Sequence, residues 1–205
     1  GGGACKFDGK NFYYYSKNEG FRSNQVVNIL QDKTGILWFA SYGGGVIKIN
    51  ENGFTHFSTI PELNRSTIYT IYEDKKGNIW FGTQSGNLIK FNRDTFYTYT
   101  QQEGFVGEKV RDILEDRNGN LLIAIQNGGI CKFDGKSFSY YRNQHSNLVA
   151  GAFSLFEDCK GNMWFGLLHK GVVKYDGHSF THFKLRKENV YEDVRSITED
   201  SKGNM

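Results

Sequence analysis

The chain has 205 residues, and its 25 Lys and Arg against 22 Asp and Glu give a formal net charge of +3, with no basic stripe and no acidic tail. This balance argues against a nucleic-acid partner. No run approaches the ~20 apolar residues of a transmembrane helix, which argues against membrane insertion, and no secretion signal opens the chain, whose first residue is Gly1.

A segment of 42 residues recurs along the whole chain without insertion or deletion. Such a fixed period is the sequence signature of a repeat architecture. Five copies are recognised by a glycine at the same phase of each, namely Gly35, Gly77, Gly119, Gly161 and Gly203.

The first element of each copy is a run of branched and aromatic residues with the length of a strand. The chain opens on Gly1 to Gly3, which align with Gly43 to Gly45, so it begins in the loop before a third strand. The predicted first strands lie near residues 26–31, 68–73, 110–115, 152–157 and 194–199.

Each first strand leads into a turn with Asp and the recurring Gly, such as residues 74–77, because Asp bonds nearby backbone groups and Gly accepts positive φ. A second strand follows, such as residues 78–83, and then a third, such as residues 45–50. In three copies an Asp-Gly hairpin signal leads into a fourth strand. Four antiparallel strands in 42 residues match a blade, so we predict an all-β fold, a β-propeller domain over residues 1–205.

Aromatic residues fall into two columns of the repeat. Burying each side chain contributes roughly 2 to 3 kcal/mol, so we expect the columns to join neighbouring blades. One column is Phe12, Phe54, Phe96, Phe138 and Phe180, and the other is Tyr15, Phe57, Tyr99, Tyr141 and Phe183.

The last copy stops at Met205, one residue before the phase of Trp38, Trp80 and Trp164. If five blades closed on themselves, the closing blade would lack its second strand and leave ladder hydrogen bonds unmade. We therefore expect the chain to be part of a larger propeller.

The repeat resembles a known family. The pattern Glu-Asp-x-x-Gly-Asn-x-Trp-Phe-Gly at residues 73–82, with Lys-Phe-Asp-Gly-Lys-x-Phe at residues 6–12 and 132–138, is similar to the two-component regulator propeller repeat. This resemblance implies an extracytoplasmic ligand-sensing region of a bacterial hybrid histidine kinase or related secreted protein, usually seven-bladed, located in the periplasm or outside the cell. Leu122 departs from the pattern at a Trp position, which predicts looser packing there.

Three repeated constellations have structural interpretations that we prefer to functional ones. Asp116 to Asn120 superficially resembles a calcium loop, but every copy repeats it as a turn, so we predict no metal. The Glu-Asp pairs at Glu73, Glu115, Glu157 and Glu199 also suggest turn stabilisation rather than acid-base catalysis. A complete Lys column is expected to run along the third strand with its charge at the blade edge, and it comprises Lys6, Lys48, Lys90, Lys132 and Lys174.

The three cysteines are too few for a disulfide framework. Cys5 and Cys131 occupy a phase that is Ile or Val in other copies, so we expect apolar packing groups, and Cys159 stands alone in a turn. We predict thiols that hold no cofactor.

The varying positions identify the candidate site. In propellers, the loops from the second to the third strand and from the fourth strand to the next first strand lie on one face around the central channel. Ligand sites commonly occupy such loops. The candidate ligand-binding residues are Tyr42, Gln84, Gln126 and His169 in the first loop, Arg22, Asn24, Lys109 and Asp193 in the second, and Arg111, Asp112 and Arg195 just inside the following strand.

Three functions remain open. The first is a non-catalytic sensing module that binds an extracellular ligand, plausibly a carbohydrate, through this face. The second is a protein interaction or dimerisation scaffold, which a broad apolar patch would favour. The third is a lyase or hydrolase, for which His169 is a weak candidate because its neighbours Leu167 and Leu168 offer no acid or base partner.

Overall fold

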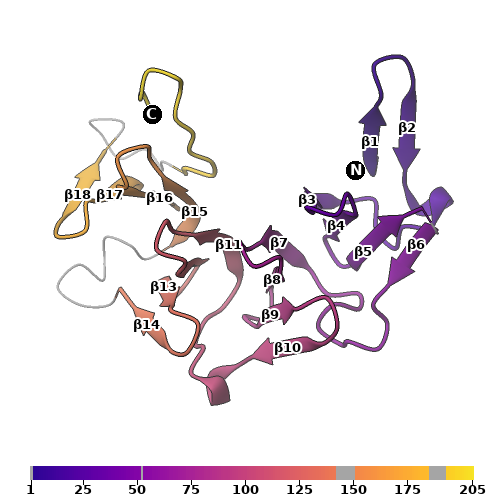
Figure 1. The fold of residues 1–205 in the computed structure, drawn as a ribbon, viewed down its shortest axis with the longest axis horizontal. Coiled ribbons are helices and arrows are strands. Elements are labelled where there is room, and N and C mark those ends of the chain that lie inside the picture. Colours follow the sequence, from indigo (N-terminus) through magenta and orange to yellow (C-terminus); the bar gives the residue numbers. More distant parts are fainter. Residues whose placement is uncertain (1, 52, 142–150, 185–192) are drawn as a thin grey trace. The chain divides into compact units, whose positions relative to one another are not determined.

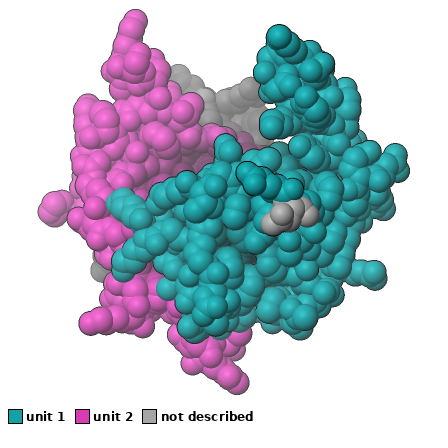
Figure 2. Space-filling view, turned by 45° about the vertical axis from the view of Figure 1, so that its right-hand side comes forward, with its two compact units in different colours: residues 1–98 teal, residues 99–205 magenta. Residues whose placement is uncertain are grey.

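The computed structural model describes residues 2–51, 53–141, 151–184 and 193–205, and the regular secondary structure of that part is β apart from two short 3-10 helices (Figure 1). It forms two compact units, Gly1–Thr98 and Tyr99–Met205, which Figure 2 colours separately. Its sheets comprise four with four strands and one with two, all antiparallel between neighbours in sequence. The predicted all-β fold with four-stranded blades is confirmed.

The first unit holds the two-stranded sheet and two four-stranded sheets. The strands are β1 (Ala4–Phe7), β2 (Phe12–Tyr15), β3 (Val26–Gln31), β4 (Leu37–Ser41), β5 (Gly45–Asn50), β6 (Gly53–His56), β7 (Ile68–Glu73), β8 (Ile79–Thr83), β9 (Leu88–Phe91) and β10 (Phe96–Tyr99). A short 3-10 helix, η1 (Lys17–Glu19), follows β2.

The second unit holds two four-stranded sheets. They are built from β11 (Val110–Glu115), β12 (Leu121–Ile125), β13 (Gly129–Phe133), β14 (Phe138–Tyr140), β15 (Ala152–Glu157), β16 (Met163–Leu167), β17 (Gly171–Tyr175) and β18 (Phe180–Phe183). A second 3-10 helix, η2 (Gln101–Glu103), precedes them.

The first four predicted first strands are confirmed at their predicted bounds, as β3, β7, β11 and β15. The fifth prediction, residues 194–199, is wrong. The Val194 amide donates to the Leu167 carbonyl of β16 at 3.0 Å, but the described residues form no strand ladder there, so the segment is not a strand. The turn that follows it does form, because the Gly203 amide donates to the Asp200 carbonyl at 3.0 Å.

Each repeat turn is closed by its aspartate. Asp158 accepts hydrogen bonds from the Asn162 backbone amide at 2.7 Å and from the Trp164 indole at 2.9 Å, and Asp32 accepts one from the Trp38 indole at 2.8 Å. In these two copies the carboxylate therefore ties the turn to the tryptophan of the second strand.

The glutamate that precedes the aspartate accepts a hydrogen bond from a neighbouring copy. Glu73 accepts the backbone amide of Lys33 at 2.8 Å, and Glu157 accepts that of Arg117 at 3.1 Å. In each case the donor belongs to the turn of the preceding sheet. The predicted turn stabilisation is confirmed for these two glutamates, but the turn that each one stabilises is that of the preceding copy, so the bond also joins successive sheets.

In the Lys column, three charges lie close to tryptophan rings. The ammonium groups of Lys48, Lys90 and Lys174 lie 5.8, 5.5 and 5.6 Å from the indole rings of the paired second strands. Each Lys is directly opposite its Trp in the ladder, as in Lys48 and Trp38. A cation over an aromatic face is attracted to it, so in these three copies the charge lies over an indole ring of the neighbouring strand.

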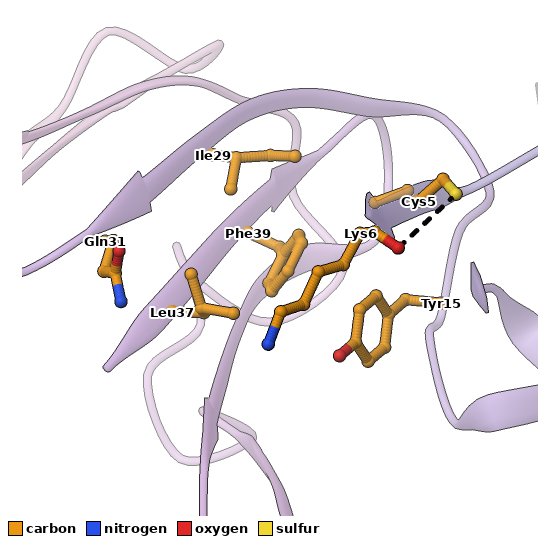
Figure 3. Close-up of a pocket in the computed structure, with 8 residues that line it drawn as sticks. Cys5, Lys6, Tyr15, Ile29, Gln31, Leu37 and Phe39 are labelled. Atoms are coloured by element: carbon orange, nitrogen blue, oxygen red, sulfur yellow. Dashed lines mark hydrogen bonds between the residues drawn. The ribbon is translucent and has the colours of Figure 1, made fainter. Parts of the chain in front are cut away.

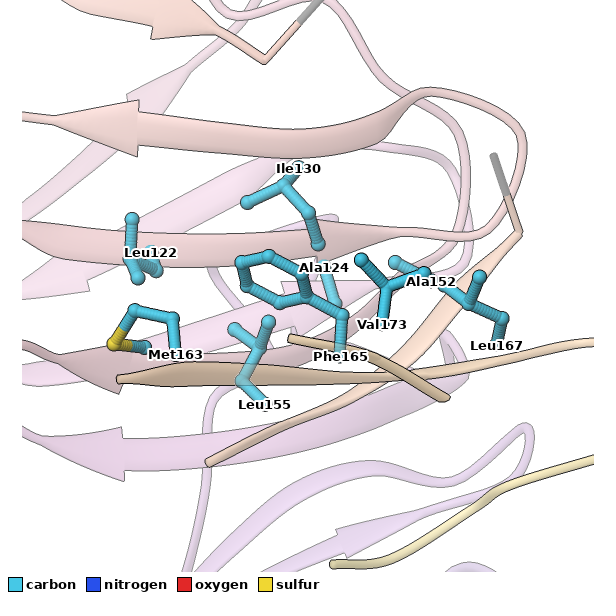
Figure 4. Packing of buried hydrophobic residues seen from close by; sticks show 9 residues of the cluster. All are labelled: Leu122, Ala124, Ile130, Ala152, Leu155, Met163, Phe165, Leu167 and Val173. Atoms are coloured by element: carbon cyan, nitrogen blue, oxygen red, sulfur yellow. The ribbon is translucent and has the colours of Figure 1, made fainter. Parts of the chain in front are cut away.

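Apolar side chains fill the space between successive sheets. In the second unit, one cluster joins Leu122 and Ile130 of one sheet to Leu155 and Phe165 of the next (Figure 4). Leu122 is 1% exposed, so the leucine at a Trp position is fully buried in this cluster.

The aromatic columns meet across sheets as predicted. In the first unit the Phe57 and Phe96 rings are 5.3 Å apart, and in the second the Tyr141 and Phe180 rings are 6.1 Å apart.

The cysteines form no disulfide. Cys131 is buried as predicted, but Cys5 is exposed, because β1 pairs only with β2 and no other described strand covers its second edge.

Candidate functional site

One end of each four-stranded sheet is where the first strand begins and the second strand ends, and we call it the loop face. One hydrogen bond fixes this end in all four sheets, from the amide of the residue after the second strand to the carbonyl of the residue before the first. The pairs are Tyr42 with Gln25, Gln84 with Thr67, Gln126 with Lys109, and Leu168 with Gly151. The loop residues are thus presented from a rigid scaffold.

This register corrects the position of His169. Leu168, not His169, stands where the other copies have Tyr42, Gln84 and Gln126. His169 is the next residue and has a left-handed backbone, with φ at 62°, as Gly43 has at 68°.

A β-bulge interrupts every first strand at the loop face. In β11 the pairing passes from Val110 to Asp112, and in β15 from Ala152 to Ser154, so one residue is left over between each pair. A bulge re-aims the side chain of its extra residue. The extra residues are Val27, Tyr69, Arg111 and Phe153.

Arg195 occupies the same repeat phase as these four, so we call the set Val27, Tyr69, Arg111, Phe153 and Arg195 the bulge column. The sequence search identified Arg111 and Arg195 but missed Tyr69 and Phe153. The repeat phase was the signal that points to them.

In the first unit, the loop face carries Tyr42, Gln84 and Tyr69. The Tyr69 hydroxyl donates to the Gln84 side-chain carbonyl at 3.4 Å, and Tyr42 is half exposed. Beside Gln84 lies an open hollow of about 400 Å³, lined by Arg65, Ser66, Thr67, Gln84 and Ser85.

Two other candidates in this unit hold the loops themselves. Arg22 donates to the Asn64 side chain of the next copy, and the Asn24 side chain accepts the Lys17 backbone amide at 2.7 Å. Their contacts are those of loop-fixing residues rather than of an open ligand site.

In the second unit, the structure brings several candidates together. Arg111 donates through Nε to the Gln126 side-chain oxygen at 2.8 Å, and its guanidinium lies 4.5 Å from the Phe153 ring centroid. The Arg195 guanidinium lies 5.6 Å from the same centroid. Two arginines from different copies therefore share one ring.

A histidine–carboxylate pair adjoins this group. The His169 Nδ1 atom is 2.9 Å from Asp193 Oδ1, and the His169 backbone amide donates to the same oxygen at 3.0 Å. Arg195 reaches the other oxygen of Asp193 at 3.5 Å. The partner of His169 thus lies 24 residues along the chain, where sequence neighbours could not reveal it.

Asp112 lies beneath the loop face, next to the bulge. Its carboxylate accepts the backbone amides of Leu155 at 2.8 Å and Ile113 at 2.9 Å. Burial raises the pKa of Asp112 to about 6, against the lowering effect of these two amides. One of its oxygens thus bonds to the neighbouring sheet and the other to its own strand, which makes Asp112 a structural residue next to the site. Lys109, next to the bulge, has a left-handed backbone with φ at 54°.

A second hollow, of about 280 Å³, lies between the β1–β2 hairpin and the β3–β4 pair (Figure 3). Its lining is mostly apolar and includes Ala4, Ile29, Leu37 and Phe39, with the Lys6 side chain across it. By its place in the repeat, β1 is equivalent to the third strand of a four-stranded sheet. In those sheets the third strand pairs with the fourth on one edge and with the second on the other, whereas β1 pairs with β2 alone and leaves its other edge open. We therefore do not assign this hollow to ligand binding.

Metal ligands do not gather in the described part of the chain, where no group of three or more His, Cys, Asp or Glu side chains is arranged to hold an ion. Over the same residues, no helix has the length and hydropathy that crossing a membrane requires.

The family model described as "Two component regulator propeller" matches residues 20–43 and 62–85. The recognised resemblance is thereby confirmed for two repeats, each including a first strand and a second strand. No curated protein sequence matches the chain.

Solved structures resemble the chain over most of its length. The extracellular domain of a protein assigned to a hybrid two-component system of B. thetaiotaomicron is 23% identical, with a TM-score of 0.75 over 94% of this chain and 27% of that one. A second such domain from B. thetaiotaomicron is 20% identical, with a TM-score of 0.70 over 90% of this chain and 28% of that one.

A virginiamycin B lyase from Staphylococcus aureus is 18% identical, with a TM-score of 0.68 over 89% of this chain and 62% of that one. At these identities the likeness shows the fold alone, which is that of a β-propeller. The chain spans only about a quarter of the length of the two B. thetaiotaomicron structures.

Proposed function

Because the chain carries two-component regulator propeller repeats on a β-propeller fold, we propose that it is the ligand-binding module of a bacterial signalling or surface protein, exposed to the periplasm or the exterior. It binds a saccharide through its loop face and has no catalytic role.

The bulge column supports this proposal more than any other feature. The backbone around it is the same in four copies, with one bulge and one clamping hydrogen bond in each. The side chain that the bulge re-aims nevertheless changes between aliphatic, aromatic and cationic. A constant frame with varied side chains is the usual construction of a binding surface.

Aromatic side chains on this face suit a saccharide, because they offer large and rigid contact area at low entropic cost. Tyr42 and Tyr69 provide it in the first unit, and Phe153 in the second. Among sugars, the aromatic faces select by shape, while Gln84 and Gln126 supply hydrogen-bonding groups.

The test is binding of a panel of neutral and acidic oligosaccharides to the 205-residue chain by isothermal titration calorimetry. Replacement of Tyr42 or Tyr69 by Ala is expected to weaken the binding that the panel reveals by about tenfold, or 1.4 kcal/mol. Tyr97→Ala is the matched control, because Tyr97 on β10 is 51% exposed and Tyr42 is 50% exposed. Equal losses in all three variants, or a panel without any binder, would overturn the proposal.

A protein interaction scaffold is the second candidate, favoured by one observation. The β1–β2 hairpin exposes four large apolar side chains, Phe7, Phe12, Tyr13 and Tyr14. Contiguous exposed aromatics are typical of protein contacts. Light scattering over a hundredfold concentration range tests it, since association that Tyr14→Ser abolishes would favour the scaffold.

A lyase or hydrolase is the third candidate, because His169 has the carboxylate partner that its sequence neighbours do not provide. Such a pair is able to act as a general base. Turnover of a panel oligosaccharide that His169→Ala abolishes would favour this function over binding alone.

A further inference from the structure

We infer that the hollow beside Gln84, on the loop face of the first unit, is a subsite for an acidic sugar whose carboxylate is bound by Arg65. This inference rests on the proposed function, since it names the class of saccharide that the loop face takes. The hollow measures about 400 Å³ and is lined by Arg65, Ser66, Thr67, Gln84 and Ser85. Its volume lies within the range of pockets that hold small molecules.

The loop that carries Arg65 is fixed on both sides of this residue. After it, the Ser66 carbonyl accepts the Gly45 amide at 2.8 Å. Before it, the Leu63 carbonyl accepts the Val46 amide at 3.1 Å, and the Leu63 side chain is fully buried. The Arg65 side chain is therefore presented from a rigid backbone, as binding residues commonly are.

The backbone of Arg65 is in a conformation that arginine disfavours. Its φ is 61°, in the left-handed region, which residues other than glycine rarely adopt because it costs free energy. Residues held in such conformations cluster at ligand-binding and active sites. At the same repeat phase the other described copies have Ser23 and Gly107, so the guanidinium is particular to this copy.

The charge of Arg65 is open to a ligand. Arg65 is exposed, and its side chain makes no hydrogen bond or ion pair with any other described residue. Among the described residues that line the hollow there is no Asp or Glu. An anion that enters the hollow therefore meets a positive charge and no negative one on its wall.

The neutral groups of the hollow supply both donors and acceptors. The Gln84 side-chain oxygen accepts the Tyr69 hydroxyl at 3.4 Å, so its NH2 group is the end of the amide that remains for a ligand. The Ser66 hydroxyl donates to the Pro61 carbonyl at 3.4 Å, and the Ser85 hydroxyl bonds to another hydroxyl at 3.0 Å. Each serine oxygen retains a lone pair that is able to accept from a sugar hydroxyl.

These groups fit one class of sugar best. The planar donor fork of arginine matches the two oxygens of a carboxylate. The amide and hydroxyl groups beside it suit the hydroxyls of a sugar ring. A ring that carries one carboxylate among hydroxyls is a hexuronic acid, and a neutral hexose would leave the guanidinium without its anion.

The experiment titrates the 205-residue chain with tetragalacturonic acid and tetramannuronic acid, each beside its full methyl ester. The ester keeps every hydroxyl of the sugar and removes the charge. We expect at least one acid to bind at least tenfold more tightly than its ester, and this preference to shrink as the salt concentration rises.

Two variants test the named residues. Arg65→Asn removes the guanidinium, and asparagine tolerates the left-handed backbone, so the preference for the acid should fall at least tenfold while ester binding stays unchanged. Gln84→Glu keeps an acceptor for Tyr69 and adds a negative charge, so it should weaken the acid alone. Lys10→Gln is the matched control, because it removes an exposed charge of the same unit at the β1–β2 turn, and it should change neither affinity.

Urea denaturation distinguishes a binding role of Arg65 from a structural one. Arg65→Asn should keep the midpoint of the wild type, because its side chain has no contact with described residues to lose. A lowered midpoint together with equal losses of acid and ester binding would mean that Arg65 shapes the loop, which overturns the subsite.

The two hypotheses fail differently. Esters that bind as well as the acids, with an affinity that depends on Tyr42 but not on Arg65, overturn the acidic subsite and leave the saccharide-binding function standing. A preference for the acid that survives Arg65→Asn does the same. Binding of none of the compounds, acidic or neutral, overturns both.

Discussion

Asp112 makes the stability of the protein depend on pH in an unusual direction. Burial raises its pKa from 3.8 to about 6 in the folded chain. Between these two values the folded state keeps a proton that the unfolded state has lost, so the free energy of unfolding falls as pH rises from about 4 to 6. At 1.36 kcal/mol per pKa unit, the whole effect is about 2 to 3 kcal/mol.

Asp112→Asn is therefore expected to remove this pH dependence while its amide oxygen still accepts the Leu155 amide. The Asn side chain also loses the hydrogen bond from the Ile113 amide, because its NH2 group replaces the oxygen that accepts that bond. The flat pH profile, rather than the absolute stability at pH 7, therefore identifies the carboxylate. Urea unfolding at pH 4, 5, 6 and 7 measures the difference, and parallel pH profiles for the two proteins would contradict the assignment.

Asp32 behaves in the opposite sense. Burial raises its pKa, but hydrogen bonds from Thr34, Trp38 and Arg93 outweigh burial and bring the pKa from 3.8 down to about 2. The folded state thus favours the charged form, and this stabilisation is present above about pH 4 and is lost as pH falls through about 2.

We expect Asp32→Asn to lower the free energy of unfolding by about 2 kcal/mol at pH 7, and the difference from wild type to shrink progressively below pH 4. Asp94→Asn, at an exposed turn of the same unit, is the control and should change stability little. A constant difference at all pH values would mean that charge is not the cause.

Between elements, Glu73 joins two successive sheets of the first unit. Glu73 accepts the Lys33 amide at 2.8 Å and pairs with Arg93 at 2.6 Å, while Arg93 also meets Asp32 at 2.6 Å. Replacement of Glu73 by Gln turns one of its two acceptor oxygens into an NH2 group, which then faces an N–H donor of Lys33 or Arg93. A buried donor that is left without an acceptor costs about 1 to 3 kcal/mol.

Glu73→Gln should accordingly lower the free energy of unfolding by that amount, whereas Glu51→Gln at an exposed turn should change it by less than about 0.5 kcal/mol. Equilibrium urea denaturation compares the two. If Glu73→Gln lowers the free energy of unfolding only slightly, both in the wild type and in the Arg93→Gln variant, the contact between the two sheets contributes little to stability.

At the scale of secondary-structure elements, some features could be predicted from the sequence and others could not. The four first strands are predicted to the residue, because the Asp and Gly chemistry of each turn is local and the period of 42 fixes the rest. Two short 3-10 helices were not predicted, although the sequence contains their capping signals. Ser16 with Glu19 and Thr100 with Glu103 each form a capping box at the start of such a helix.

Contacts between copies were not predictable in this way. Glu73 is adjacent in sequence to its own turn, and only the folded chain shows that it bonds the turn 40 residues earlier. The bulges leave no trace in the period, because every copy has one. The phase of Arg111 and Arg195 also contains Tyr69 and Phe153, but nothing in the repeat marks that phase as a bulge, so these two residues were missed. For His169 the period of 42 residues is itself sufficient, because it places Leu168 at the phase of Gln126.

Over the whole molecule, ladder pairing predicts a ranking of backbone protection. The inner strands β8 and β12 are fully buried and paired on both edges, whereas β1 and β2 form a two-stranded sheet. Exposed hydrogen bonds open most easily. Hydrogen–deuterium exchange should therefore be faster in residues 4–15 than in residues 79–83 or 121–125.

Equal protection of all three segments would contradict this ranking and would mean that the open edge of β1 is covered in solution. Repeating the exchange at tenfold lower protein concentration distinguishes cover by a second copy from cover within one chain, because only the former is lost on dilution.

The separations of the bonds between neighbouring copies have an evolutionary consequence. Lys33 with Glu73, Arg117 with Glu157, and Cys159 with Glu199 are each 40 residues apart. Unequal crossing-over that adds or removes one whole repeat preserves every such spacing, while any other indel destroys several at once. The gene is therefore able to grow by tandem duplication. Each new copy keeps the hydrogen bonds to its neighbours and adds one residue at the bulge whose side chain is open to selection.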